Sequence, residues 1–273
     1  MQTGDSIRVR FTVPDRTTDG LPMASVEAVD LRFDEEPVAV TATEPGPIEV
    51  RVPLAPWVGK QIRIQVRVAS DKGRWSENPA VVDLTAIAAL APPANVTAES
   101  DPRGLRLRWT AVPGGSVVVS RRNPATAQFD DVERVSGDTW VDSGAPYGTP
   151  QTYRVRATAP AGASWADSEF SPEIAFTPVD SFAPATPTKL AAVAGLNAIE
   201  LAWEQSPEPD TAGYQVYRAG EEGEFERLGE RTAAASYSDS KVESGKTYRY
   251  AVTAVDTAGN ESARSEPLAA TAP

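Results

Sequence analysis

The chain has 273 residues, of which 41% are hydrophobic and 23% charged, with 24 prolines, 19 glycines and a net charge of −12. It contains no cysteine and no histidine, which excludes disulfides, thiolate metal sites, cysteine nucleophiles and the commonest general base of enzymes. Acidic residues outnumber basic ones in each third of the chain, so no segment offers the basic face that nucleic acid or an anionic lipid surface requires.

A chain of this length suits two or three modest domains, and its many prolines and glycines indicate short strands joined by turns. No apolar run approaches the roughly 18 residues of a membrane-spanning segment. The start, MQTGDSIRVR, lacks the apolar core of a secretory signal peptide. We therefore expect no transmembrane segment, and either a cytosolic protein or a chain that begins after its targeting segment.

In chain order, the first predicted strand alternates apolar and polar residues, and it recurs twice further along. Its three copies are Ile7-Val9-Phe11, Leu105-Leu107-Trp109 and Ile199-Leu201-Trp203. A proline follows each aromatic residue within a few positions and would end the strand. Alternation of this kind is typical of an antiparallel strand with one face on the core and the other in water.

A second alternating segment begins after a glycine and ends before another glycine in each copy. The launching glycines are Gly59, Gly148 and Gly245, and the last inward positions are Val68, Ala157 and Ala254. The closing glycines are Gly73, Gly162 and Gly259. The spacing is the same in all three copies and predicts a half-buried strand between two turns that need glycine. A repeat of roughly 90 residues predicts one small β-sandwich per copy.

These segments resemble the fibronectin type III family. The resemblance rests on the strand-B tryptophans in LRLRWTAVP and IELAWEQSP, the strand-F tyrosines in TYRVRATAPAG and TYRYAVTAVDTAGNES, and the phrases GYQVYRAG and SEPLAATAP. It implies an all-β fold of three tandem immunoglobulin-like β-sandwiches in a semi-rigid rod. The implied domains are 1–90, 91–180 and 181–273, named repeats one, two and three. The third is similar to the repeats of bacterial surface proteins and lipoproteins.

Repeat one departs from this pattern. Phe11 replaces the strand-B tryptophan, Ile64 replaces the strand-F tyrosine, and only six residues precede Ile7. The other repeats have longer segments there for strand A, in PPANVTAES and PTKLAAVAG. We therefore expect strand A of repeat one to be missing or truncated.

The aromatic residues of strands B and F are expected to lie in the cores, because their burial removes a large apolar area from water. They are Trp109, Trp203, Tyr153 and Tyr250. Each repeat should close its own two-sheet interior, with no sheet continuing across the joints.

Because cysteine and histidine are absent, carboxylates are the main side chains that could carry out catalysis. A glycoside hydrolase needs two carboxyl groups about 5–10 Å apart across a cleft, and a row of small sandwiches offers no obvious cleft, so we expect no enzyme. The acidic clusters Asp34-Glu35-Glu36, Glu208-Pro-Asp210 and Glu221-Glu222 lack the alternate oxygen spacing of a calcium loop. We read them as solvated turns and expect no metal and no cofactor.

Strand F also presents several arginines to the outer face of its sheet: Arg63, Arg67, Arg154, Arg156 and Arg249. Such a row could form a ligand face. Cross-strand ion pairs, worth about 0–1 kcal/mol each, are the simpler expectation.

Two tryptophans stand in the loop after strand F, namely Trp75 in DKGRWSEN and Trp165 in AGASWADS. Loops at sandwich ends carry binding in many proteins of this architecture. Solvent-facing indoles can stack on sugar rings or anchor a protein partner, whereas packed indoles would seal the sandwich end or a domain joint. Trp75 and Trp165 are therefore the candidate ligand contacts, and no catalytic residue is assigned.

Two functions of different class remain open. The first, implied by the resemblance, is a non-catalytic extracellular or cell-surface scaffold, spacer or adhesion module that mediates protein interactions, with lipid anchoring ahead of Met1 as one variant. The second is a carbohydrate-binding accessory region that uses the two loop tryptophans, and a carboxylate-based hydrolase is a remote third. The expected partner is a protein or a polysaccharide, and the chain is expected to be a monomer. Burial of both faces of the indole rings would remove the carbohydrate hypothesis.

Overall fold

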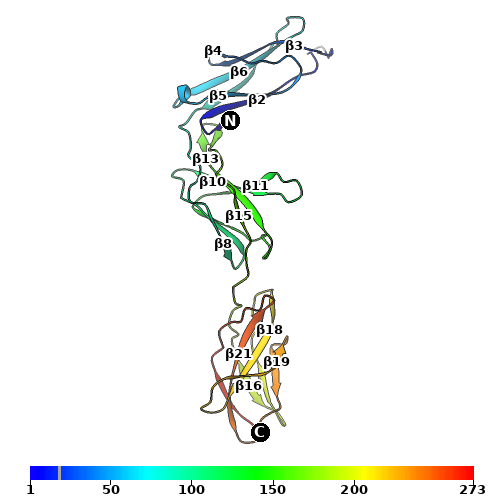
Figure 1. Ribbon diagram of the computed structural model, residues 1–273, viewed down its shortest axis with the longest axis vertical. Coiled ribbons are helices and arrows are strands. Elements are labelled where there is room, and N and C mark those ends of the chain that lie inside the picture. Colours follow the sequence, from blue (N-terminus) through cyan, green and yellow to red (C-terminus); the bar gives the residue numbers. More distant parts are fainter. Residues whose placement is uncertain (18–19) are drawn as a thin grey trace. The chain divides into compact units, whose positions relative to one another are not determined.

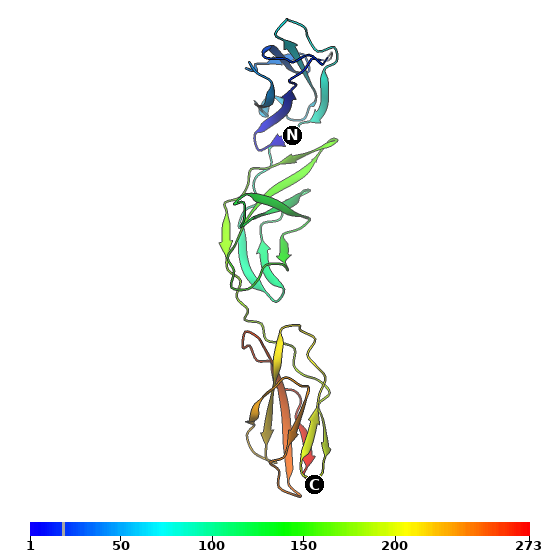
Figure 2. The same cartoon turned by 90° about the vertical axis from the view of Figure 1, so that its right-hand side faces the viewer.

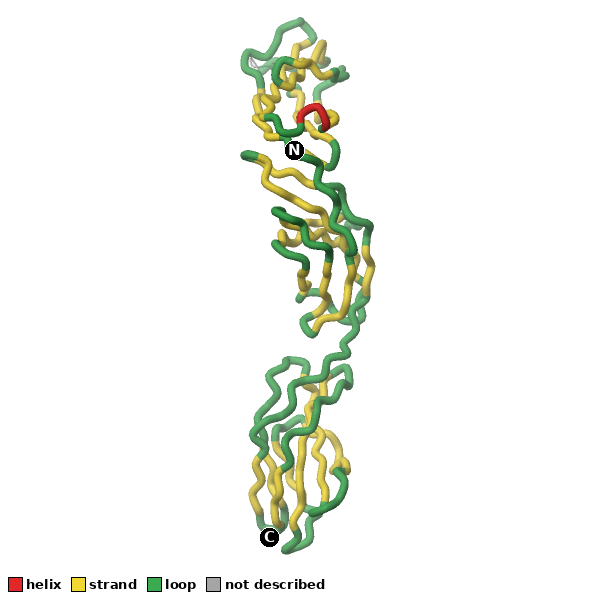
Figure 3. Tube along the Cα trace, turned by 90° about the vertical axis from the view of Figure 1, so that its left-hand side faces the viewer, coloured by secondary structure: helices red, strands yellow, loops and turns green. Residues whose placement is uncertain are grey.

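The computed structural model describes residues 1–17 and 20–273, and this part of the chain is nearly all β, with one short 3₁₀ turn, η1 (Ala55–Trp57). Figure 1 follows the strands in chain order, and Figure 3 distinguishes strands from loops. The chain folds as two compact units, unit 1 (Met1–Pro178) and unit 2 (Val179–Pro273). The prediction of an all-β fold built from small, largely antiparallel sheets is confirmed.

In unit 1, the strands of repeat one pack around one hydrophobic cluster. One group is the sheet β4-β3-β6-β7, and β2 and β5 lie on the other side of the cluster. The strands are β2 (Ser6–Val13), β3 (Val26–Phe33), β4 (Glu36–Val38), β5 (Gly46–Pro53), β6 (Gln61–Ser70) and β7 (Ala80–Thr85). Ile7, Leu31 and Phe33 are fully buried, and the ring of Trp57 lies 5.4 Å from that of Phe33.

Repeat two, also in unit 1, has the same two-layer arrangement. Its smaller sheet is β12-β9-β8, and β11-β10-β13 with β14 and β15 form the other layer. The strands are β8 (Thr97–Asp101), β9 (Gly104–Arg108), β10 (Ser116–Arg122), β11 (Phe129–Val135), β12 (Thr139–Asp142), β13 (Gln151–Ala161), β14 (Ser164–Asp167) and β15 (Ile174–Phe176). Trp109 and Tyr153 are buried in its core, as the sequence predicts.

Unit 2 is formed by two sheets, β16-β17-β20 and β19-β18-β21-β22 (Figure 2). The strands are β16 (Ala191–Ala194), β17 (Ile199–Ala202), β18 (Thr211–Ala219), β19 (Glu226–Thr232), β20 (Ser236–Asp239), β21 (Thr247–Asp256) and β22 (Leu268–Thr271). Trp203 and Tyr250 are buried between the sheets, which confirms their predicted role. Strand B of the family is therefore β2, β9 and β17, and strand F is β6, β13 and β21.

The launching glycines set the start of strand F. Gly59, Gly148 and Gly245 have φ values of 83°, 74° and 75°, which side chains with a Cβ rarely adopt. Each glycine donates its main-chain N–H to a carbonyl near the end of the same repeat. The acceptors are Ala86, Pro178 and Ala272, at 2.8, 2.8 and 3.2 Å. The same turn therefore ties strand F to the end of each repeat.

In two of the repeats, an arginine bonds to a buried aspartate that also accepts a hydrogen bond from the buried tyrosine of strand F. Tyr153 donates its hydroxyl to Asp142 Oδ2 (2.7 Å), and Arg121 donates to the same oxygen (2.8 Å). Burial, followed by the hydrogen bond to Asp142, raises the pKa of the Tyr153 hydroxyl. Unit 2 repeats the arrangement with Tyr250, Asp239 and Arg218.

Serine hydroxyls bond the outer edge of strand F in the same two repeats. In unit 1, Ser168 and Ser171 accept the main-chain N–H groups of Ala157 and Val155 at 2.9 and 3.1 Å. In unit 2, the corresponding pairs are Ser262 with Ala254 and Ser265 with Val252, at 2.9 and 3.0 Å. The hydroxyls thus accept the N–H groups that the carbonyls of a neighbouring strand would accept, while the main-chain N–H groups of the serines donate to the carbonyls of the same strand-F residues.

One sheet crosses from repeat one into repeat two, so the prediction that no sheet would cross the joints is wrong for this joint. The short strand β1 (Gln2–Thr3) pairs antiparallel with β2 and parallel with β14. Gln2 is fully buried, and its side-chain amide exchanges two hydrogen bonds with the main chain of Ile87, at 2.9 and 3.1 Å. The N–H of Gly4 donates to the carbonyl of Asp167 (2.8 Å). The reduced strand A bonds to the neighbouring repeat, which the sequence pattern did not indicate.

Replacing Gln2 by alanine tests this connection. Gln2→Ala removes both amide bonds and leaves the Ile87 groups unpaired, so it should lower the free energy of unfolding of unit 1 by about 1–3 kcal/mol. Calorimetry of the whole chain should show the unit 1 transition moving while that of unit 2 stays. The exposed Gln61→Ala is the control, and an equal effect of both substitutions would contradict the role given to Gln2.

The buried tyrosines predict a loss of stability at alkaline pH. In the unfolded chain tyrosine ionises near pH 10, whereas the raised pKa values keep Tyr153 and Tyr250 neutral when folded. Their contribution is therefore complete below about pH 10 and falls as pH rises further. Urea denaturation of Tyr250→Phe should show a smaller loss across this range, and about 1–3 kcal/mol less stability at neutral pH. An unchanged alkaline slope would show that the hydroxyl is not responsible.

Candidate functional site

The outer face of the sheet β11-β10-β13 in unit 1 is covered by stacked arginine and aromatic side chains. We name this row the arginine–aromatic ladder, and it consists of Arg122, Phe129, Arg154, Phe170 and Arg156. Successive guanidinium carbons and ring centres lie 4.7, 4.1, 3.7 and 5.1 Å apart. A guanidinium is attracted to the face of an aromatic ring. The side chains of the ladder therefore contact one another and cover this face of the sheet.

The ion pairs expected for strand F occur at Arg63 and Arg156. Arg63 pairs with Asp83 on β7 (3.1 Å), and Arg156 pairs with Asp131 on β11 (2.6 Å) and with Asp167 on β14 (3.2 Å). The hydrogen bond to Asp131, opposed by burial, raises the pKa of Arg156. These two arginines therefore have partners within the sheet, which favours a structural role over a free ligand face.

Trp165 lies on β14, opposite Pro160 of β13, and its side chain is only partly covered. The guanidinium carbon of Arg134 lies 3.9 Å from the centre of its ring, yet 42% of Trp165 remains exposed. Arg134 forms no ion pair with the residues that the structure describes. An exposed indole and an exposed guanidinium therefore lie together at the end of this hairpin.

Trp75 occupies the corresponding loop of repeat one, where it forms a single bridge with Ala69 of β6. It is 43% exposed, and the guanidinium carbon of Arg67 lies 5.7 Å from its ring centre. Arg67 itself donates to the carbonyl of Ser76 (3.1 Å), which holds the arginine beside the ring. Trp75 bridges to β6 and Trp165 lies on β14, which belong to different sheets, so each can offer one ring to a ligand.

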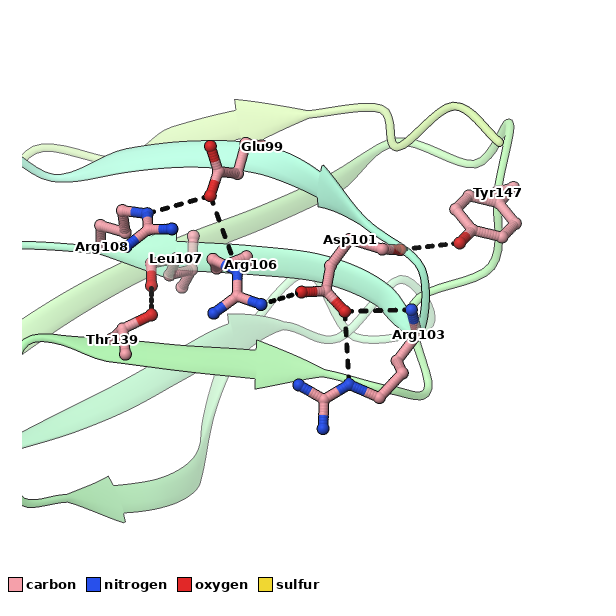
Figure 4. A network of polar contacts seen from close by, with 8 residues as sticks. All are labelled: Glu99, Asp101, Arg103, Arg106, Leu107, Arg108, Thr139 and Tyr147. Atoms are coloured by element: carbon pink, nitrogen blue, oxygen red, sulfur yellow. Dashed lines mark hydrogen bonds and ion pairs between the residues drawn. The ribbon is translucent and has the colours of Figure 1, made fainter. Parts of the chain in front are cut away.

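A polar network closes the β8–β9 hairpin at the other end of repeat two (Figure 4). The carboxylate of Asp101 is almost fully buried and accepts hydrogen bonds from the main chain of Arg103 (3.0 Å) and from the Arg106 guanidinium. Tyr147 donates its hydroxyl to the carbonyl of Asp101 (2.7 Å). Burial raises the pKa of Asp101, but the hydrogen bonds that its carboxylate accepts from Arg103 and Arg106 outweigh burial and hold the pKa below its usual range. The network holds the turn and leaves no free carboxylate for chemistry.

Unit 2 brings three carboxylates together that are far apart in the sequence. Oxygens of Asp180, Asp210 and Asp256 lie within 4.8 Å of one another. Asn260 donates to Asp256 through its main chain and its side chain, both at 2.8 Å. Burial raises the pKa of Asp256, but the hydrogen bonds from Asn260 and from the main chain of Gly259 and Ala258 together hold the pKa below its usual range. Carboxylate oxygens are the ligands that calcium prefers, so this is the part of the described chain that could hold a hard cation.

In the sequence, Asp210 stands out only with its neighbour Glu208, and nothing there indicates this group. Asp180 precedes β16, Asp210 lies just ahead of β18, and Asp256 ends β21. Their meeting depends on the sheet pairing of β18 with β21, in which Thr211 lies opposite Asp256. The one local signal was the turn Asp256 to Asn260 in VDTAGN, where the asparagine fixes the aspartate.

Among the described residues, no helix has the length and hydropathy of a membrane-spanning segment.

Comparison with known proteins gives matches to parts of this chain. No family model matches it. The chain is 36% identical over 84 residues to an amylopullulanase of Thermoanaerobacterium saccharolyticum, covering 30% of this chain and 6% of the relative. It is 34% identical over 147 residues to exoglucanase B of Cellulomonas fimi, covering 51% of this chain and 13% of the relative. The chain therefore spans only a small share of the curated relatives that it matches.

A solved structure, an Fn3-like protein from Clostridium thermocellum, is 30% identical to this chain. The match covers 34% of this chain and 96% of that protein, with a TM-score of 0.30. The match extends over nearly the whole of that protein, and the strands of each repeat of this chain pack on two sides of one hydrophobic core. The fold is that of a protein built from β-sandwiches that follow one another along the chain. The chain belongs to the fibronectin type III family.

Proposed function

We propose that this chain is a non-catalytic accessory region of a larger extracellular protein, in which repeats one, two and three (1–90, 91–180 and 181–273) are three modules that act as spacer and scaffold. The supporting observation is the pattern of matches: 84 residues of this chain align with 6% of an amylopullulanase, and 147 residues align with 13% of an exoglucanase. Placement at a bacterial cell surface, including attachment through a lipid anchor, is the finer form of the proposal.

Three of the four buried carboxylates in the part of the chain that the structure describes support a structural role. Asp101, Asp142 and Asp239 are each held by an arginine, and the last two also accept a hydrogen bond from a buried tyrosine. A catalytic acid needs a proton that it can give to a substrate across a cleft. These three carboxylates are instead tied into a hairpin and two cores.

The absence of catalysis can be tested with the purified chain. Incubation with pullulan, starch or cellulose should release no reducing sugar above the level of a heat-denatured sample. Release that persists through repeated purification and falls in a variant of an exposed carboxylate would contradict the accessory role.

Carbohydrate binding at the loop tryptophans is the second candidate function. It is favoured by one observation: Trp165 and Trp75 each keep over two fifths of their surface exposed while an arginine supports the ring. The apolar face of a sugar ring can stack on such an indole, and the free guanidinium of Arg134 can donate hydrogen bonds to neighbouring hydroxyl groups. A single ring with one arginine offers a small contact area, so this hypothesis implies weak binding to a long polysaccharide chain.

Affinity electrophoresis in gels that contain pullulan or soluble β-glucan tests this candidate. Trp165→Ala should weaken retardation at least fivefold, about 1 kcal/mol, and Trp75→Ala should act independently because the two rings lie on different sheets. The control is Leu196→Ala, which removes a side chain that is 96% exposed. Equal retardation of all variants would show that the tryptophans do not bind these polymers.

A further inference from the structure

The three repeats differ in what covers the outer face of the sheet that contains strand F. In repeat two, this face carries the arginine–aromatic ladder. Unit 2 has a second ladder in the same place, formed by Arg249, Phe225, Arg264 and Tyr217. Successive guanidinium carbons and ring centres lie 5.3, 5.6 and 4.4 Å apart. Each of these two faces is therefore covered by side chains of its own repeat.

The sixth residue after the launching glycine shows how repeat one differs. In repeat two this residue is Arg154, which lies between the rings of Phe129 (4.1 Å) and Phe170 (3.7 Å). In unit 2 it is Ala251, which is fully buried. In repeat one it is Gln65, which is only partly buried, and its side chain forms no hydrogen bond with residues 1–17 and 20–273. Repeat one thus keeps a free amide at a position that the other repeats cover.

The ring of Phe170, which covers this position in repeat two, has no counterpart in repeat one. Ser76 and Ser168 are equivalent, because each donates its main-chain N–H to the corresponding carbonyl of strand F, at 2.9 Å in both repeats. Two residues further on, Asn78 stands where repeat two has Phe170. The outer face of the repeat-one sheet therefore lacks this cover. It points away from the core, and β2 and β5 lie on the other side of that core.

Four side chains of β6 point to this open face. β6 lies between β3 and β7 in its sheet, and Figure 1 shows it beside β3. The four residues are Gln61, Arg63, Gln65 and Arg67, and the isoleucines between the first three are buried. Residues directly opposite each other in an antiparallel pair share a face, so β7 adds Val81 beside Gln65. It also adds Asp83, which forms the ion pair with Arg63.

This row of side chains has an exposed ring at one end and a polar hollow at the other. Trp75 bridges to Ala69, beyond Arg67, and is 43% exposed, while Val81 is 47% exposed. The hollow is lined only by polar or charged residues, namely Asp34, Glu35, Gln61, Arg63, Gln65 and Asp83. From Gln61 to Ala69 the strand spans roughly 25 Å. We name this surface, from Trp75 across Val81 to the hollow, the β6 face.

The free polar groups of the β6 face can both donate and accept hydrogen bonds. Arg63 and Asp83 hold each other by their ion pair. In residues 1–17 and 20–273, the side chains of Gln61, Gln65 and Glu35 form no hydrogen bond. An amide offers donors and an acceptor, and a carboxylate accepts. Three carboxylates against one guanidinium make the hollow negative, which disfavours an anionic ligand. The hydroxyl groups of a neutral sugar, which donate and accept, match these groups.

We propose that the β6 face binds an extended, neutral polysaccharide chain that runs along β6. One sugar ring stacks on the indole of Trp75, and the chain passes over Val81 with an apolar edge. Its hydroxyl groups then bond the amides of Gln65 and Gln61 and the carboxylate of Glu35. This inference rests on the second candidate function, carbohydrate binding at the loop tryptophans, and extends the Trp75 site from one ring to the length of a strand.

Affinity electrophoresis of the whole chain in soluble β-glucan, whose chain is extended, is the direct test. Trp75→Ala should weaken retardation about fivefold and Gln65→Ala about threefold, and their thermal unfolding should match that of the parent. The matched control is Gln205→Ala, which removes an exposed amide of unit 2 and should leave retardation unchanged. Cellotriose at about 1 mM should compete poorly, because it is too short to join the ring to the hollow.

The variant Trp165→Ala separates the β6 face from the other exposed indole. The two rings belong to different sheets, so this variant should keep the part of the retardation that comes from repeat one. Adding Gln65→Ala to Trp165→Ala should then remove most of what is left. Adding Gln205→Ala instead should remove none of it.

Three results would overturn the proposal. If Trp165→Ala is no longer retarded while the parent is, carbohydrate binding stands at Trp165 and the β6 face does not bind. If neither the parent nor any variant is retarded, carbohydrate binding itself fails as well. If Trp75→Ala and Gln65→Ala are retarded like the parent, and the chain binds poly-lysine less tightly after Asp83→Asn, the ligand of the hollow is a basic protein segment.

Discussion

Burial of every second residue of strand F against strand B is the interaction on which the rest of this structure depends. In repeat two and unit 2, Tyr153 and Tyr250 are fully buried, and their hydroxyls are fixed by Asp142 and Asp239. Because side chains of a strand alternate between faces, a slip of one residue would move the whole inward set into water. The glycine turns at both ends of the strand allow only the observed register.

The fixed register also determines the surface. With Tyr153 inward, Arg154 and Arg156 must point outward, where they meet Phe129 and Phe170 of neighbouring segments. The arginine–aromatic ladder is thus a consequence of core packing. Trp165 differs because it lies on β14, opposite the exposed Pro160 near the end of the β13–β14 hairpin. Its exposure is a property of the hairpin end, which makes it available for recognition.

Repeat one shows what happens when parts of this scheme are replaced. Ile64 stands where the other repeats have a tyrosine, and the Phe33–Trp57 contact fills the end of the core without a buried aspartate. Its reduced strand A, β1, pairs with β14 of the next repeat. Part of the main-chain hydrogen bonding of repeat one is therefore made with repeat two. Unit 1, which contains both repeats, is the smallest part of the chain in which these hydrogen bonds are complete.

Local patterns predicted the alternating strands, the glycine turns and the four core aromatics, because each depends on spacing within a short segment. Features that join distant segments were not predictable in this way. The pairing of β1 with β14 joins residues more than 150 positions apart, and the meeting of Asp180, Asp210 and Asp256 depends on sheet register. The guanidinium beside the ring of Trp165 comes from Arg134, which lies on another strand. The sequence placed Trp165 shortly after strand F, although in a loop and not on β14, and it gave no sign of this neighbour.

The serine hydroxyls along strand F have a consequence for a chain built from similar units. Neighbouring modules on one polypeptide meet at effective concentrations in the millimolar range, and a newly made strand F with free N–H groups could join the wrong sheet. Ser168 and Ser171, like Ser262 and Ser265, occupy these donors from within their own module. In these two modules the hydroxyls therefore leave fewer strand-F donors open to a strand of another module.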